Sequence, residues 1–128
     1  MTRIRLALAA TLLAGALASP ATAGENARSG SFEGANGHVT TGGVSLVETG
    51  DGHVVRLAED FSLDGAPDPR VVLGRDGEYV EAGDLGALEA KTGAQEYAVP
   101  GDIDASTYDT VFIWCGEFSV SLGSAALE

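Results

Sequence analysis

Three side chains of this 128-residue chain have the chemistry to hold a soft metal or a redox group: Cys115, which is the only cysteine, and the two histidines His38 and His53. Two histidines and one cysteine suit a blue-copper centre. However, no histidine follows soon after Cys115, and the only methionine is Met1. The cysteine pairs of zinc sites and the Cys-x-x-Cys-His motif of covalent c-type haem are absent. Cys115 is therefore open to three roles: pairing with another molecule, a ligand, or an inert buried side chain.

Cys115 lies in residues 108–122, a stretch rich in apolar and aromatic residues that also contains the only tryptophan. Its β-branched and aromatic residues predict a strand, in which successive side chains point to opposite faces. The even-numbered residues, from Phe112 and Trp114 to Leu122, form an apolar face that we expect to be core. The odd-numbered face is apolar up to Cys115 and polar after it, which predicts a thiol at the point where a buried face opens to water. A bulge at Gly116 would break this alternation.

The rest of the chain alternates short strand-like segments with turn residues, and no helical period persists in it. This pattern predicts an all-β fold, an antiparallel β-sandwich or barrel-like single domain. In its core we expect Val111, Phe112, Ile113 and Trp114, together with Tyr97 and Phe118. The strand-like segments are 38–48, 53–57, 70–73, 79–80, 93–99 and 108–122, with 85–88 undecided between a strand and a helical turn.

The N-terminal residues 1–23 have the pattern of a secretory signal peptide. Arg3 and Arg5 precede a short run of Ala and Leu, and Ala21-Thr22-Ala23 forms a small-residue cleavage site. We expect a flexible leader over 24–36 and a β domain over 37–128. Removing 23 of the 128 residues leaves 105, with 5 basic and 19 acidic residues. This charge argues against nucleic acid as a partner, and no membrane-spanning segment is expected after cleavage.

Several motifs, taken in order, give the sequence from about Gly37 to Leu127 a resemblance to the DM-thirteen domain family. These motifs are Gly37-His38 with Gly42, Glu59-Asp60-Phe61, Pro67-Asp68, Val71-Val72-Leu73, Gly93-x-Gln95-x-Tyr97-x-x-Pro100, Tyr108-Asp109, Val111 to Cys115, and Phe118-Ser119-Val120. The family consists of predicted electron-transfer domains, found beside DOMON domains in animal surface proteins and alone in exported bacterial proteins.

The resemblance places the characteristic cysteine of the family on Cys115. It implies an exported bacterial protein, periplasmic or secreted, that acts as a redox carrier or accessory rather than as a stand-alone enzyme and that works with a redox partner protein. Cys115 would act as a naked thiol or hold a prosthetic group, with haem and copper both open, and Trp114 would pack behind it. For a metal centre, His38 is the better second ligand, because His53 follows a hairpin turn. The alternative is a non-enzymatic β-sandwich module that binds a ligand or a protein and has a structural cysteine.

Overall fold

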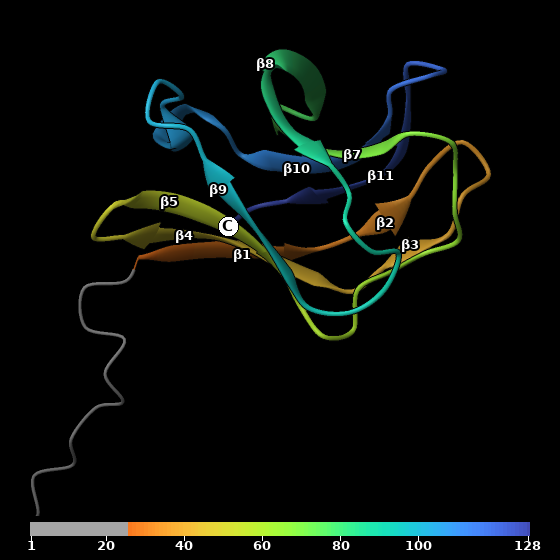
Figure 1. Ribbon diagram of the computed structural model, residues 1–128, viewed down its shortest axis with the longest axis horizontal. Helices are drawn as coiled ribbons and strands as arrows, with labels where there is room; N and C mark the ends of the chain where they lie inside the picture. The colour runs from red at the N-terminus through yellow and green to blue at the C-terminus, as the bar shows by residue number, and fades with distance from the viewer. Residues whose placement is uncertain (1–25) are drawn as a thin grey trace, which may run out of the picture.

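The computed structural model describes residues 26–128 and shows two antiparallel sheets facing each other (Figure 1). Sheet A has the strand order β1-β4-β5-β9. Its strands are β1 (Ala27–Ser31), β4 (Gly43–Thr49), β5 (Gly52–Leu57) and β9 (Gln95–Val99). The all-β sandwich expected from the sequence is therefore confirmed.

Sheet B lies across the core from sheet A and has the order β2-β11-β10-β7-β8. A third, two-stranded sheet, β3-β6, closes one end of the sandwich. The strands of sheet B are β2 (Glu33–Gly34), β7 (Pro69–Arg75), β8 (Glu78–Ala87), β10 (Thr110–Cys115) and β11 (Val120–Ala126); those of the third sheet are β3 (Thr40–Thr41) and β6 (Ser62–Leu63). The short helical turn η1 (Ala105–Thr107) precedes β10. The undecided segment 85–88 is mostly strand, because β8 runs to Ala87.

The segment predicted as a flexible leader instead contributes a strand to each sheet, which corrects that expectation for its described residues. β1 pairs along its whole length with β4, and β2 pairs with β11. Between them, Phe32 is buried, and its ring packs edge-on against Phe61 at 5.5 Å between centroids. Burial of this aromatic ring and backbone pairing outweigh the Gly- and Ser-rich composition that suggested a loose segment. The predicted signal peptide, 1–23, lies outside the described residues.

The apolar stretch 108–122 is a hairpin rather than one strand. β10 ends at Cys115, residues 116–119 form the turn, and β11 returns from Val120. Phe118 lies in this turn with 64% of its surface exposed, so its predicted place in the core is wrong. Tyr97 is buried on β9, as expected. The turn is tight enough to put Ser119 in the left-handed region, at φ 53°.

The inner face of β10 carries the odd-numbered residues, which corrects the prediction that the even-numbered face is the core. Val111, Ile113 and Cys115 join the main hydrophobic cluster between the sheets. Phe112 and Trp114 point the other way, where β8 curls over the outer face of sheet B (Figure 1) and Tyr79 stacks on Trp114. Phe112 is buried and Trp114 is half-buried. Because both faces of β10 are covered, both are apolar, and alternation alone does not show which one faces the core.

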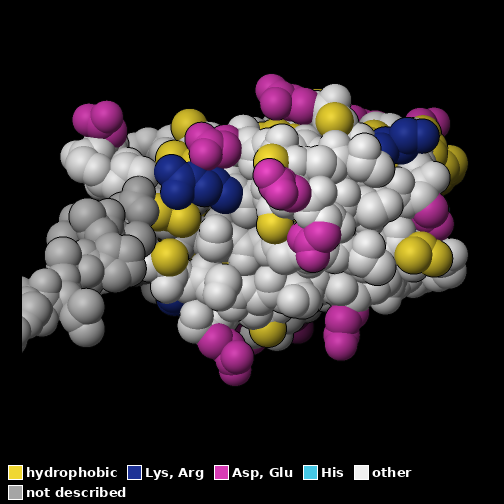
Figure 2. Space-filling view, turned by 90° about the horizontal axis from the view of Figure 1, so that it is seen from below, with side chains coloured by type: hydrophobic (Ala, Val, Ile, Leu, Met, Phe, Trp, Pro, Cys, Tyr) yellow, Lys and Arg dark blue, Asp and Glu magenta, His cyan; other side chains and the backbone are white. Residues whose placement is uncertain are grey.

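Acidic side chains are spread over the surface, as the charge of the sequence requires. Seen from the side of sheet A, they stand apart from one another, and the apolar side chains form separate small spots (Figure 2). Scattered apolar atoms of this kind are normal for a protein surface. Among residues 26–128 no helix has the length and apolar character needed to cross a membrane.

Candidate functional site

Cys115 lies at the end of β10, on the face that looks into the sandwich. Only 1% of its surface is exposed, and Val111 and Ile113 precede it on the same face. Its Sγ atom donates a hydrogen bond to the carbonyl oxygen of Pro67, at 3.1 Å. A carbonyl only accepts hydrogen bonds, so this contact requires the protonated thiol. The thiol is thus enclosed by the core, not open to water as the alternation pattern predicted.

The loop that carries Pro67 also contacts the next residue of the hairpin. The backbone N–H of Gly116 donates to the carbonyl of Asp68 at 2.9 Å. A Cβ atom at position 116 would lie 2.1 Å from the Asp68 carboxylate and 2.9 Å from the Arg70 side chain. A larger residue at position 116 would therefore displace the side chains of Asp68 and Arg70.

An ion-pair network surrounds the same end of the hairpin. Arg70 donates through Nε to Asp84 at 2.8 Å and through Nη1 to Asp68 at 3.4 Å. The pairing with Asp84 raises the pKa of Arg70, and Asp68 adds to the effect. Asp68 itself has a φ of 50°, which non-glycine residues adopt rarely. These contacts fasten the end of the loop beside Cys115.

Trp114 does not share the environment of Cys115, although the two residues are adjacent. Its ring is stacked on Tyr79 at 4.0 Å between centroids and meets Phe112 edge-on at 6.0 Å. Burial raises the pKa of Tyr79, and the nearby carboxylates of Asp84 and Glu81 raise it further. The aromatic group therefore lies on the outer face of sheet B and the thiol on the inner face. The proposed cofactor role of Trp114 stays a prediction.

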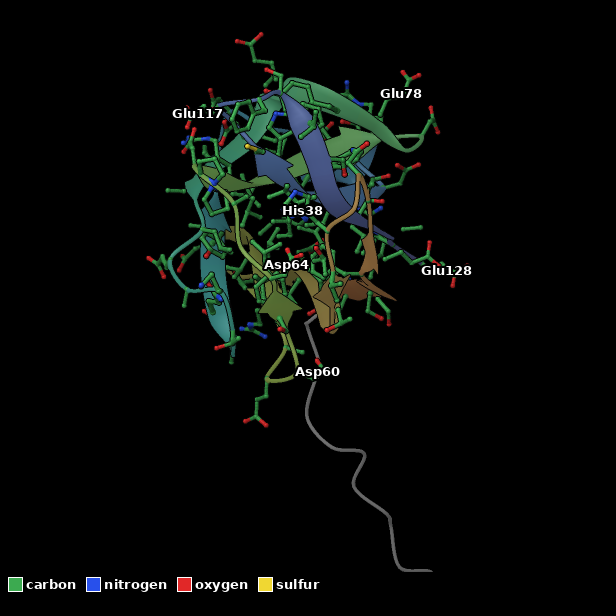
Figure 3. All side chains as sticks on the ribbon, turned by 90° about the vertical axis from the view of Figure 1, so that its right-hand side faces the viewer. His38, Asp60, Asp64, Glu78, Glu117 and Glu128 are labelled. Atoms are coloured by element: carbon green, nitrogen blue, oxygen red, sulfur yellow. The ribbon has the colours of Figure 1, made fainter. Side chains whose placement is uncertain are left out.

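His38 precedes β3 and is paired with a loop residue. Its Nδ1 lies 3.0 Å from Oδ1 of Asp64, while Oδ2 of Asp64 accepts the N–H of Val39 at 3.0 Å. These two hydrogen bonds, the backbone one first, lower the pKa of Asp64. Figure 3 shows His38 and Asp64 side by side, and Glu117 in the hairpin turn that follows Cys115 away from them. His53 is on β5 of sheet A, where its Nε2 lies 3.8 Å from Oε2 of Glu48, whereas His38 lies beside the third sheet.

The described residues, as placed, do not fit a resident metal or haem at Cys115. Residues 26–128 contain no group of three or more His, Cys, Asp or Glu side chains that could hold a metal ion. The sulfur donates to a carbonyl rather than facing a second donor. Four surface hollows of this part of the chain have neither Cys115 nor His38 in their walls. The pair of His38 and Cys115 as metal ligands stays a prediction.

What the structure does connect is His38 and Cys115 through one loop. Asp64, at the start of this loop, pairs with His38, and Pro67, near its end, accepts the bond from Cys115. The sequence analysis named Pro67 and Asp68 only as part of a family motif and predicted no contact between either of them and Cys115. A segment with two aspartates, a glycine and prolines predicts a loop, but nothing in it predicts which distant side chains the loop contacts.

The fold and this site define a small β-sandwich domain with a single enclosed thiol at the end of a central strand. The chain belongs to the DM13 family, described as electron transfer DM13, which matches residues 31–127. This is the DM-thirteen family that the sequence motifs indicated. Membership assigns the chain a redox-related role and suggests that it works with a redox partner. Neither the curated proteins nor the solved structures contain a significant match to the chain.

Proposed function

We propose that this protein is an exported redox accessory domain, periplasmic or secreted, that exchanges electrons through Cys115 as a naked thiol. Three observations support the proposal. The family is an electron-transfer family, the chain has one cysteine, and residues 1–23 have the pattern of a signal peptide. In an oxidising compartment an unpaired cysteine needs protection or a use, and here it is enclosed.

The observation that favours a thiol over a ligand is the hydrogen bond from Sγ to Pro67. A metal-bound cysteine is a thiolate, which has no proton to donate. The same bond makes Cys115 a protected reductant that reacts only when it loses this contact. The stacked pair of Trp114 and Tyr79 lies on the opposite face of the strand from the thiol.

The chemistry that one thiol supports with a disulfide-bearing partner is thiol–disulfide exchange. Cys115 loses its proton and attacks one sulfur of the partner disulfide, forming a mixed disulfide. The other partner sulfur leaves as a thiolate and takes up a proton. Since this chain has no second cysteine, a thiol from another molecule must attack the partner sulfur of the mixed disulfide. That thiol forms a disulfide with the partner sulfur, and Cys115 leaves as a thiolate and takes up a proton. This requirement makes the protein an accessory of its partner rather than a stand-alone enzyme.

The test begins with a visible spectrum of protein isolated from its native host, followed by titration in a glutathione redox buffer. We expect a colourless protein, an N-terminus at Gly24, and a single mixed disulfide with glutathione at Cys115, identified by mass spectrometry. A Soret band or a thiolate-to-copper band would contradict the naked thiol and favour a prosthetic-group ligand. An unprocessed N-terminus would contradict export.

A second candidate function is a non-enzymatic binding module in which Cys115 is a structural side chain. The observation that favours it is burial, because Cys115 is as enclosed as the aliphatic core around it. The two proposals differ in their expectation for Cys115→Ser, which is close in size and keeps a hydrogen-bond donor. A structural cysteine predicts a change in stability alone. A redox thiol predicts loss of the mixed disulfide and of the redox phenotype of the host, and an unchanged phenotype would contradict it.

A further inference from the structure

The loop between β6 and β7, residues 64–68, lies against the Cys115 thiol, because the carbonyl of Pro67 accepts its hydrogen bond. We call these five residues the strap. Asp64, Pro67 and Asp68 are exposed, yet the carbonyl of Pro67 contacts a sulfur that is 1% exposed. A single thickness of backbone therefore separates the thiol from water at this point.

One end of the strap is fastened to the segment before β3. His38 pairs with Asp64 at 3.0 Å, and the backbone of Val39 both donates to the Asp64 carboxylate and accepts the Asp64 N–H at 3.0 Å. We call this end the latch. The side chains of His38 and Asp64 are 29% and 40% exposed, so the pair lies at the surface, where breaking it does not disturb the core.

The other end of the strap is fastened to the hairpin by two hydrogen bonds, from Cys115 Sγ to Pro67 and from Gly116 N–H to Asp68. Between the two ends, Gly65 has a φ of 120°, a value that suits glycine, and Asp68 has a φ of 50°. The strap thus has a fastened start, a fastened end, and a glycine between them where the backbone turns most easily. Asp68 also pairs with Arg70 at 3.4 Å, and Ala66 packs against the core. Short segments with exposed residues at both ends are nevertheless the kind that open locally, without global unfolding.

We infer that the strap is a lid over Cys115 and that the His38–Asp64 latch sets how often it opens. In the closed lid the thiol is protonated and covered. In the open lid the bond to Pro67 is lost and the sulfur reaches a reagent or a partner. The role of the lid rests on the proposed function, because a redox thiol needs controlled access. The opening of the strap does not depend on that function. It also gives His38 a role that needs no metal.

The experiment measures the rate at which iodoacetamide alkylates Cys115 in the folded, full-length mature protein, followed by mass spectrometry. Asp64→Asn keeps an oxygen for the N–H of Val39 but removes the charge that faces His38. His38→Gln removes the imidazole. Each variant should raise the rate about two- to fivefold, the effect expected of a partly exposed pair. The double variant should equal the larger single effect, because both changes break the same contact.

The matched control is Glu48→Gln, which alters the other His–carboxylate pair of the described residues, His53–Glu48 at 3.8 Å on sheet A. This variant should alkylate at the wild-type rate. A rate that rises equally in Glu48→Gln would show an unspecific charge effect and overturn the latch.

A second measurement separates opening of the strap from unfolding of the domain. Alkylation is repeated at several low urea concentrations. A strap opening exposes little surface, so its rate should depend only weakly on urea, whereas alkylation through global unfolding follows the full urea dependence of stability. Full urea dependence in the wild type and the variants would overturn the lid. That failure would leave the redox role of Cys115 standing, while a Cys115→Ser variant without a redox phenotype would remove the role but not the lid.

Discussion

The Tyr97 hydroxyl stands at the centre of a small buried network that the sequence motif Gly93-x-Gln95-x-Tyr97 encodes. It accepts the N–H of Glu89 at 2.9 Å and donates to the side-chain oxygen of Gln95. The Gln95 amide in turn binds both backbone groups of Ala90. These contacts fasten the loop that leads into β9, so the motif residues shared with the family serve the fold here.

Tyr97→Phe should therefore destabilise the domain by about 1–3 kcal/mol, because it leaves the Glu89 N–H and the Gln95 oxygen with fewer partners. Urea unfolding at neutral pH measures this loss. Burial also raises the pKa of Tyr97 above its ordinary 10.0. Its contribution to stability is present below pH 10.0 and is lost as the pH rises through the raised value. The free energy of unfolding of the variant should fall less than that of the wild type in this alkaline range. An equal fall in both proteins would contradict the network.

At the scale of elements, β10 is the strand whose two faces are covered by different parts of the fold. Val111, Ile113 and Cys115 pack between the sheets, and Phe112 and Trp114 lie under β8. Cross-strand pairing with β7 and β11 holds both sets in place. β10 is the middle strand of sheet B, and its last residue, Cys115, carries the thiol.

This arrangement predicts that truncating the smaller side chain of Ile113 destabilises the domain more than truncating the larger side chain of Trp114. Ile113 is fully buried in the core, so Ile113→Ala should cost about 2–5 kcal/mol. Trp114 is half-buried on the outer face, and Trp114→Ala should cost about 2 kcal/mol through lost stacking and area. Thermal or urea unfolding of the two variants decides the matter. A larger loss for Trp114→Ala would put the core on the even-numbered face after all.

At the scale of the whole molecule, the surface is strongly acidic, and several carboxylates are bound into the structure. Hydrogen bonds lower the pKa of Asp64, Asp104 and Asp109 below the ordinary 3.8: the N–H of Val39 for Asp64, the Ser106 hydroxyl for Asp104, and the N–H of Asp76 for Asp109. Each group therefore contributes stability that is fully present above pH 3.8 and is lost as the pH falls through the lowered value.

We expect the free energy of unfolding, measured with urea, to fall steeply when the pH is lowered from 3.8 towards 2. Above pH 3.8 these three groups should contribute no pH dependence, so changes there reflect the repulsion among the other acidic residues. Asp109→Asn, which keeps an oxygen for the N–H of Asp76, should reduce the acid-induced loss. The same loss in this variant as in the wild type would contradict the assignment.

Much of this protein is determined by its sequence alone, because local patterns carry the information. Alternating apolar residues and turn residues define an all-β domain with the β4–β5 hairpin, and the ordered motifs define the family. The identity of Cys115 as the one thiol needs no structure. The sequence patterns gave a wrong prediction where one segment allowed two structures. β10 is apolar on both faces, so the pattern did not show which face is the core. Residues 27–34 have the composition of a loop but form strands of both sheets.

Only the tertiary structure decided the surroundings of the thiol. The contact from Cys115 to Pro67 joins residues 48 positions apart, and that from His38 to Asp64 joins residues 26 apart. Such contacts depend on the order of strands in the sheets and on the direction in which each loop crosses the end of the sandwich. Local propensity predicts neither the strand order nor the path of a loop, because it reflects only a residue and its near neighbours. Packing depends instead on which distant surfaces meet. The sequence therefore names the reactive group, and the fold determines what covers it.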